Sequence, residues 1–132
     1  MILVDTSVIV AWLDKDHAAH SACTRALEYF AARDTLSVSS VTYAELASGA
    51  RTREGVDEAL KGFELLELDF SDAWRAGQAF RQYRRQASDD PVLPDFFIRA
   101  QAAVRNLPHL TNDRRRIKSF PEVDFEFVDA KG

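Results

Sequence analysis

The sequence predicts an α/β fold of three layers, in which a mostly parallel central sheet of about five strands is flanked by helices. Short apolar runs alternate along the chain with longer stretches whose apolar residues recur at helical spacing. Strands that are separated by helices run parallel, because each crossover returns the chain to the same end of the sheet. The chain has 132 residues, of which 46% are hydrophobic. That is enough for one core, so a single domain over residues 1–132 is expected.

The order of the elements follows from these runs. The last apolar run alternates apolar and acidic residues, as an edge or half-buried strand does. The strands are expected at Ile2–Val4, Leu36–Ser39, Leu65–Leu68, His109–Thr111 and Val123–Val128. The helices are expected at about residues 7–14, 18–33, 42–51, 54–64, 72–86 and 95–105.

Composition excludes several classes of protein. The formal net charge is -4, so any contact with nucleic acid must be local, for example through the basic residues gathered at 81–85 and 114–118. The single cysteine, Cys23, excludes an intrachain disulfide framework and a cysteine-rich zinc site. An acid at position 5 interrupts the first apolar run, and no run reaches transmembrane length. We therefore expect no membrane segment and a cytoplasmic location.

Four acids map to one edge of the predicted sheet. Asp5 and Asp113 directly follow predicted strands, while Glu45 and Asp95 lie near the start of helices that follow strands. Open α/β sheets bind ligands at this carboxyl edge. Two carboxylates about 4 Å apart repel by roughly 4 kcal/mol at an effective dielectric near 20, and a cation relieves that repulsion. Oxygen ligands favour Mg²⁺ or Mn²⁺, as one ion or two.

Each acid also has an ordinary structural explanation. Asp5 is placed to cap the following helix, and Glu45 lies in the capping-box spacing Thr42-x-x-Glu45. Asp95 is favourable at a helix start, and Asp113 suits an Asx turn. Taken singly, these explanations compete well with a metal site. The convergence of all four acids on one edge favours the metal.

The chemistry that suits such a site is hydrolysis of a phosphodiester by metal-activated water. The hydroxyls of Thr6, Ser7 and Thr111 stand beside the acids, where they either orient a carboxylate or water, or make turn and cap hydrogen bonds. Arg114 and Arg115 follow Asp113 and are expected to contact RNA phosphates.

Four motifs in this order resemble the PIN-domain family, over about residues 2 to 127, and the chain length resembles the VapC-type toxins. The motifs are Val4-Asp5-Thr6-Ser7, Ala44-Glu45-Leu46, Pro94-Asp95 before a helix of small residues, and Leu110-Thr111-Asn112-Asp113. The resemblance implies an endoribonuclease in which Asp5, Glu45, Asp95 and Asp113 bind Mg²⁺ or Mn²⁺. It also implies a homodimer and a VapB-type antitoxin whose C-terminal segment occupies and blocks the active-site groove.

The sequence departs from this family in two places. Such domains often carry an acid and an aromatic soon after the last motif, whereas residues 114–116 are all arginine here. The helix after Asp95 carries Phe96, Phe97 and Gln101, where smaller or aliphatic residues are common.

Other classes remain to be compared. The start of the chain also resembles the haloacid dehalogenase phosphatases, but Ser7 stands where their second acid is required. A phospho-receiver domain has a similar size, but it needs an early acid pair that this chain lacks. The remaining alternative is a catalytically silent PIN-like domain that binds RNA or a partner, and metal-dependent cleavage separates it from a nuclease.

Overall fold

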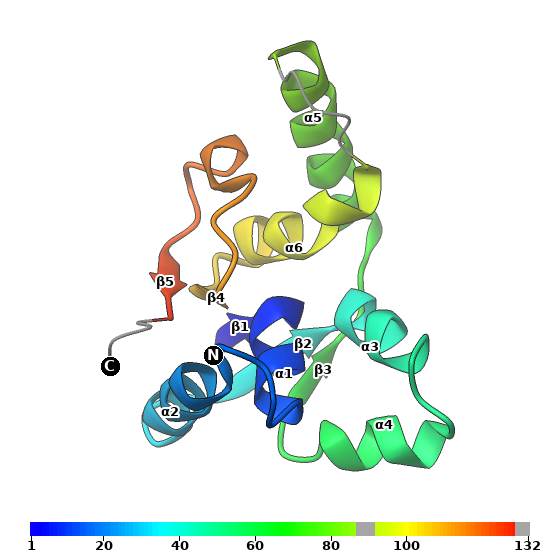
Figure 1. Ribbon diagram of the computed structural model, residues 1–132. Helices are drawn as coiled ribbons and strands as arrows, with labels where there is room; N and C mark the ends of the chain where they lie inside the picture. Colours follow the sequence, from blue (N-terminus) through cyan, green and yellow to red (C-terminus); the bar gives the residue numbers. More distant parts are fainter. Residues whose placement is uncertain (87–91, 129–132) are drawn as a thin grey trace.

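The computed structural model describes residues 1–86 and 92–128, and this part of the chain forms a five-stranded sheet (Figure 1). All neighbouring strands are parallel, in the order β3-β2-β1-β4-β5. The strands are β1 (Ile2–Val4), β2 (Leu36–Ser39), β3 (Glu64–Leu66), β4 (His109–Thr111) and β5 (Phe125–Phe127). The predicted α/β class with a parallel sheet is therefore confirmed.

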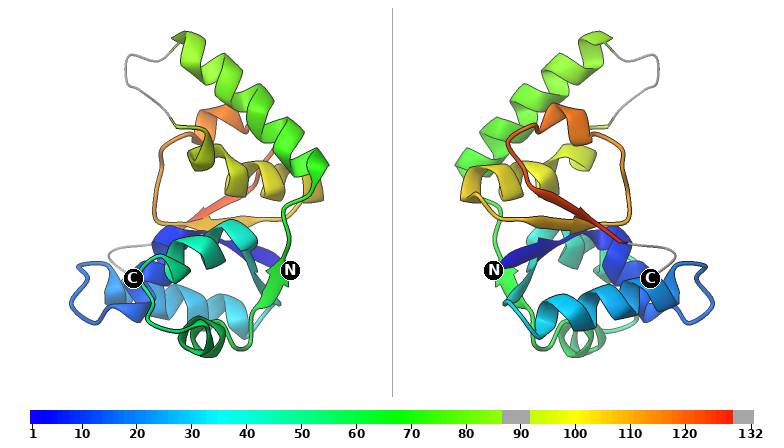
Figure 2. Two further views of the ribbon diagram at one scale, coloured as in Figure 1. Left: turned by 90° about the vertical axis from the view of Figure 1, so that its right-hand side faces the viewer. Right: turned by 90° about the vertical axis from the view of Figure 1, so that its left-hand side faces the viewer.

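Helices cover both faces of the sheet. They are α1 (Thr6–Leu13), α2 (His20–Ala31), α3 (Ser40–Ala47), α4 (Arg53–Ala59), α5 (Phe70–Gln86) and α6 (Phe97–Arg105), with 3₁₀ turns η1 (Leu93–Phe96) and η2 (Ile117–Ser119). The side views in Figure 2 place α5 and α6 on one side of the sheet and α2 and α4 on the other. Strand β1 contributes to the core on both faces of the sheet, because Ile2 and Val4 pack in one cluster while Leu3 packs against Ile98 and Ala102 of α6 in another.

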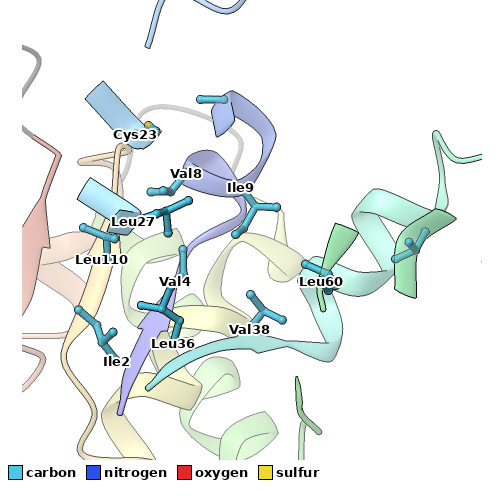
Figure 3. Close-up of a cluster of buried hydrophobic side chains, with 12 residues drawn as sticks. Ile2, Val4, Val8, Ile9, Cys23, Leu27, Leu36, Val38, Leu60 and Leu110 are labelled. Carbon is cyan, nitrogen blue, oxygen red and sulfur yellow. The ribbon is translucent and has the colours of Figure 1, made fainter. Parts of the chain in front are cut away.

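The larger core cluster lies between the sheet and helices α1, α2 and α4. In Figure 3, Val8 and Ile9 of α1 lie beside Val4 of β1, and Leu27 of α2 approaches Leu110 of β4. These side chains are buried, and their burial fixes α1 directly after the end of β1. The turn between them carries Asp5.

The opposite layer is built around Phe96. This fully buried ring contacts Phe80 and Tyr83 of α5 and Phe120 of the C-terminal region, at centroid distances of 5.5, 5.6 and 6.3 Å. On the next turn, Gln101 Nε2 donates to the carbonyl oxygens of Leu66 and Glu67 at 3.1 and 3.2 Å. The large residues after Asp95 thus hold η1 and α6 against α5 and the end of β3.

Several predicted boundaries were wrong. The helix expected over residues 54–64 ends at Ala59, because the chain turns at Gly62, whose φ is +95°, and enters β3 at Glu64. The strand expected at Leu65–Leu68 therefore lies at Glu64–Leu66. Likewise, the helix expected from residue 42 begins at Ser40, with Ser39 as its cap.

Among the helices of residues 1–86 and 92–128, none combines the length and apolar character that crossing a bilayer requires.

Candidate active site

The four predicted acids line a single pocket of about 420 Å³ at the carboxyl edge of the sheet. Asp5 follows β1 and Asp113 follows β4, and these two strands are neighbours in the sheet. Glu45 is carried by α3 and Asp95 by η1. The pocket walls thus come from segments more than a hundred residues apart in the sequence.

Asp5 is oriented by hydroxyl groups. Its Oδ2 accepts hydrogen bonds from Ser7 Oγ at 2.7 Å and from Thr111 Oγ1 at 2.9 Å. Asp5 stands at the N-cap position of α1, yet its side chain makes no capping hydrogen bond. The capping explanation for Asp5 is therefore wrong, and its carboxylate is directed into the pocket instead.

Glu45 is held by Thr6. The Thr6 hydroxyl donates to Glu45 Oε1 at 2.9 Å and also lies 2.8 Å from the buried hydroxyl of Thr42. Because Thr42 lies inside α3 and Ser39 caps that helix, the capping-box explanation is wrong. Partial burial raises the pKa of Glu45, the hydrogen bond from Thr6 opposes the shift, and the negative charges of Asp5 and Asp95 raise it further. The acids are thus close enough to repel one another.

Asp113 and Asp95 are paired with arginines. Arg115 donates to both carboxylate oxygens of Asp113, with Nη2 2.8 Å from Oδ2 and Nε 3.1 Å from each oxygen. The Arg115 backbone N–H also donates to Asp113 Oδ1 at 2.9 Å, so the Asx turn considered for Asp113 is present. Burial by itself raises the pKa of Asp113, but the hydrogen bonds and charge of Arg115, together with the charge of Arg99, outweigh it and the net shift is downward. Arg116 Nη2 lies 3.4 Å from Asp95 Oδ2.

Arg99 is a site residue that the sequence analysis missed. Only 4% of it is exposed, and it lines the pocket. Its Nη2 donates to the carbonyl oxygen of Asp113 at 2.6 Å and its Nε to that of Arg115 at 3.1 Å. Burial lowers the pKa of this guanidinium, and the charges of Asp5 and Asp113 oppose the shift. Arg99 follows Asp95 by four residues, which puts both on one helix face. This spacing was the sequence signal that could have identified Arg99 as a site residue.

The two predicted RNA contacts differ in position. Arg115 lines the pocket, whereas Arg114 stacks its guanidinium over Phe127, 3.9 Å from the ring centroid, and is not part of the pocket lining. His17, which was not among the predicted site residues, also lines the pocket.

The donor set suits a hard divalent ion, although the acids are not arranged around one. Four carboxylates and the hydroxyls beside them are oxygen ligands of the kind that Mg²⁺ and Mn²⁺ prefer. The pKa of Glu45 is raised mainly by burial, and the charges of Asp5 and Asp95 add to that shift. Within the described residues, however, no three His, Cys, Asp or Glu side chains are grouped closely enough to hold a metal ion. Asp113 and Asp95 pair with arginine guanidinium groups instead.

Beneath Asp5 lies a buried histidine. His109 Nδ1 is 2.9 Å from the carbonyl oxygen of Leu3, and its Nε2 is 3.9 Å from Asp5 Oδ1. Burial lowers the pKa of His109 to about 4, against the opposing charge of Asp5. The ring is therefore neutral at pH 7, donates from Nδ1 to Leu3, and forms no ion pair with Asp5.

Because His109 is buried in its neutral form, we expect the free energy of unfolding to fall in mild acid. The unfolded chain takes up the proton near the ordinary histidine pKa of about 6.5, whereas the folded chain resists it down to about 4. The His109 contribution is thus present above about pH 6.5 and is lost as pH falls. We expect it to lower the free energy of unfolding by about 2 kcal/mol between pH 7 and pH 5, measured by urea denaturation. His109→Gln should flatten this dependence; an unchanged slope in that variant would contradict the assignment.

Comparison with known proteins gives one family and many structures. The family model described as PIN domain matches residues 2–126. No curated protein sequence matches the chain. VapBC2 from Rickettsia felis, solved with a DNA fragment from its promoter, is similar with a TM-score of 0.75 and 21% identity, over 98% of this chain and 100% of that one.

Two further solved structures show the same fold. A toxin–antitoxin complex from Klebsiella pneumoniae matches with a TM-score of 0.73 and 20% identity, over 98% of each chain. VapC20 from Mycobacterium tuberculosis, described as a toxin that cleaves the sarcin–ricin loop, matches with a TM-score of 0.65 and 17% identity, over 93% of this chain and 98% of that one. At these identities the likeness is one of fold.

Proposed function

This chain belongs to the PIN-domain family, and from that premise we propose that it is a Mg²⁺- or Mn²⁺-dependent endoribonuclease. We propose further that it is the toxin of a VapBC-type toxin–antitoxin module and that residues 1–132 form a single nuclease domain. The observation that carries the proposal is the single pocket lined by Asp5, Glu45, Asp95 and Asp113. Four acids that line one pocket at the carboxyl edge of the sheet suit metal-assisted phosphate chemistry.

In this proposal the four acids hold one or two divalent ions. A bound ion would acidify water and neutralise charge on the phosphate in the transition state. The hydroxyls of Ser7 and Thr111 keep the Asp5 carboxylate directed into the pocket, and Thr6 does the same for Glu45. These hydroxyls need not touch the substrate, because they act by fixing the acids.

RNA is the proposed substrate because cations lie both in and beside the pocket. Arg115 lines the pocket, and Arg114 is exposed beside it at the surface. Phosphate contacts of this kind position a nucleic acid without reading its sequence. They suit a chain whose overall charge is negative and whose contact with RNA must be local.

We propose two protein partners, an antitoxin and a second copy of the chain. The open pocket is where the C-terminal segment of a VapB-type antitoxin would block the acids. On α5, one turn apart, Phe70 and Trp74 are 94% and 71% exposed. Large apolar side chains in such positions are the kind that a homodimer covers, so their exposure supports a dimer. We also propose that this dimer acts in the cytoplasm.

The first test is RNA cleavage by the purified, antitoxin-free chain. A structured RNA pool is incubated with Mg²⁺, with Mn²⁺ and with EDTA, beside an Asp95→Asn variant prepared identically. We expect cleavage with either metal ion, none with EDTA and none with the variant, which controls for contaminating nuclease. If the chain binds Mn²⁺ and RNA but leaves every RNA intact, the silent, RNA- or partner-binding alternative is favoured over a nuclease.

A further inference from the structure

Three arginines line the acid pocket, and they differ in how firmly they are held. Arg99 is buried and bonded to two backbone carbonyls. Arg116 is 9% exposed at its side chain, donates to the Tyr83 hydroxyl at 2.7 Å and lies over the rings of Tyr83 and Phe96. Arg115 is different, because 69% of its side chain is exposed.

Within the described residues, every side-chain hydrogen bond of Arg115 goes to the Asp113 carboxylate. The guanidinium uses both oxygens, and the Arg115 backbone N–H uses Oδ1 again. A carboxylate has about four lone-pair positions, and a metal ion needs the same ones. A divalent ion on Asp113 must therefore compete with Arg115 for this acid.

Charge favours the metal ion in that competition. The pocket lining holds four carboxylates and three guanidinium groups, so its side chains leave about one uncompensated negative charge when all are ionised. A divalent ion added beside a guanidinium that stayed on Asp113 would bring like charges within a few ångströms of each other. An exposed ion pair stabilises little, so Arg115 is the arginine that can leave at low cost.

We propose that Arg115 is an exchangeable cation of this site. It pairs with Asp113 in the metal-free protein, a divalent ion displaces its guanidinium, and the released guanidinium then binds an RNA phosphate at the mouth of the pocket. The proposal rests on the proposed metal and RNA chemistry of the same site. It makes Arg115 a positioning residue for RNA that is available only when metal is bound, so that metal and RNA strengthen each other's binding.

The first test is Mn²⁺ affinity, measured on the full chain by isothermal titration calorimetry. The variant Arg115→Ala is compared with Arg114→Ala, which removes the same charge from a neighbouring guanidinium that stacks on Phe127. Arg115→Ala removes the exposed ion pair that competes with Mn²⁺ for the Asp113 carboxylate. We therefore expect this variant to bind Mn²⁺ about two- to fivefold more tightly than the wild type. Arg114→Ala should change it by clearly less. Equal effects in the two variants, or weaker Mn²⁺ binding by Arg115→Ala, would overturn the exchange.

The second test is RNA binding without cleavage. A fluorescent 2′-O-methyl RNA hairpin is titrated with and without Mn²⁺ at several salt concentrations. For Arg115→Ala we expect weaker RNA binding than wild type only when Mn²⁺ is present. The slope of log affinity against log salt concentration should then fall by about the amount that one phosphate contact contributes. Arg114→Ala should weaken binding alike in both conditions. A loss of RNA affinity in Arg115→Ala that is the same with and without Mn²⁺ would show a permanent phosphate contact and refute the exchange.

These measurements separate the exchange from the nuclease proposal. A chain that cleaves no RNA but shows both Arg115-specific effects would retain the exchange and lose the nuclease. A chain that cleaves RNA while its two arginine variants bind Mn²⁺ equally would retain the nuclease and lose the exchange.

Discussion

Replacement of Asp5 by Asn is expected to leave the fold intact and to lower RNA cleavage by roughly 10²- to 10³-fold, the effect of losing several kcal/mol of charge stabilisation. The substitution is nearly isosteric, and the remaining carbonyl oxygen can still accept from Ser7 and Thr111. It removes one of the repelling charges that raise the pKa of Glu45. The metal-free variant should therefore be at least as stable as the wild type in urea denaturation.

The matched control is Asp124→Asn, an exposed acid outside the pocket lining. It should cleave RNA at the wild-type rate, with the same metal dependence. Wild-type cleavage by Asp5→Asn would remove Asp5 from the proposed metal site, even if the chain proved to be a nuclease.

Replacement of Arg99 by Ala is expected to lower the free energy of unfolding by about 3 kcal/mol, because it removes two hydrogen bonds to backbone carbonyls and a buried counter-charge. The carbonyl oxygen of Arg115 would lose its Arg99 donor, and that of Asp113 would keep the Thr111 hydroxyl at 3.1 Å. Asp5 would lose a nearby positive charge. Urea denaturation at pH 7 measures the change. The same substitution at Arg81, an exposed residue of α5, should stay within about 0.5 kcal/mol of the wild type.

Arg99→Met separates packing from charge in this result. Methionine fills much of the same volume but carries no donor for the two carbonyls. Its stability should fall between those of wild type and Arg99→Ala. A full return to wild-type stability in Arg99→Met would show that the guanidinium contributes by packing alone.

Local patterns of the sequence predict much of the architecture. Apolar runs such as Ile2–Val4 became strands, and the stretches between the strands became helices, because burial of one face imposes its own period on the chain. The parallel arrangement followed from the alternation of strand and helix. The same reasoning sent Asp5, Glu45, Asp95 and Asp113 to one edge of the sheet, and all four line one pocket there.

Other features depend on contacts that no local pattern records. The boundary between α4 and β3 was misplaced because Leu60 and Phe63 continue a helical spacing of apolar residues, whereas the positive φ of Gly62 turns the chain into β3. The capping box considered as an alternative at Thr42 is absent, and the Thr42 hydroxyl instead lies 2.8 Å from that of Thr6, thirty-six positions away. In each case a tertiary contact or a single backbone angle outweighed the local preference.

The sequence by itself determined the fold class and the meeting of four acids at one edge of the sheet. Both depend on strand ends and helix starts, which short-range periodicity and turn chemistry set. Only the tertiary structure decided what surrounds those acids. Arg99 is buried because α6 packs against the loop after β4, and Arg115 meets Asp113 because that loop folds back on itself. The charge state of a pocket is a sum over residues from distant segments, and only the packed chain brings those segments together.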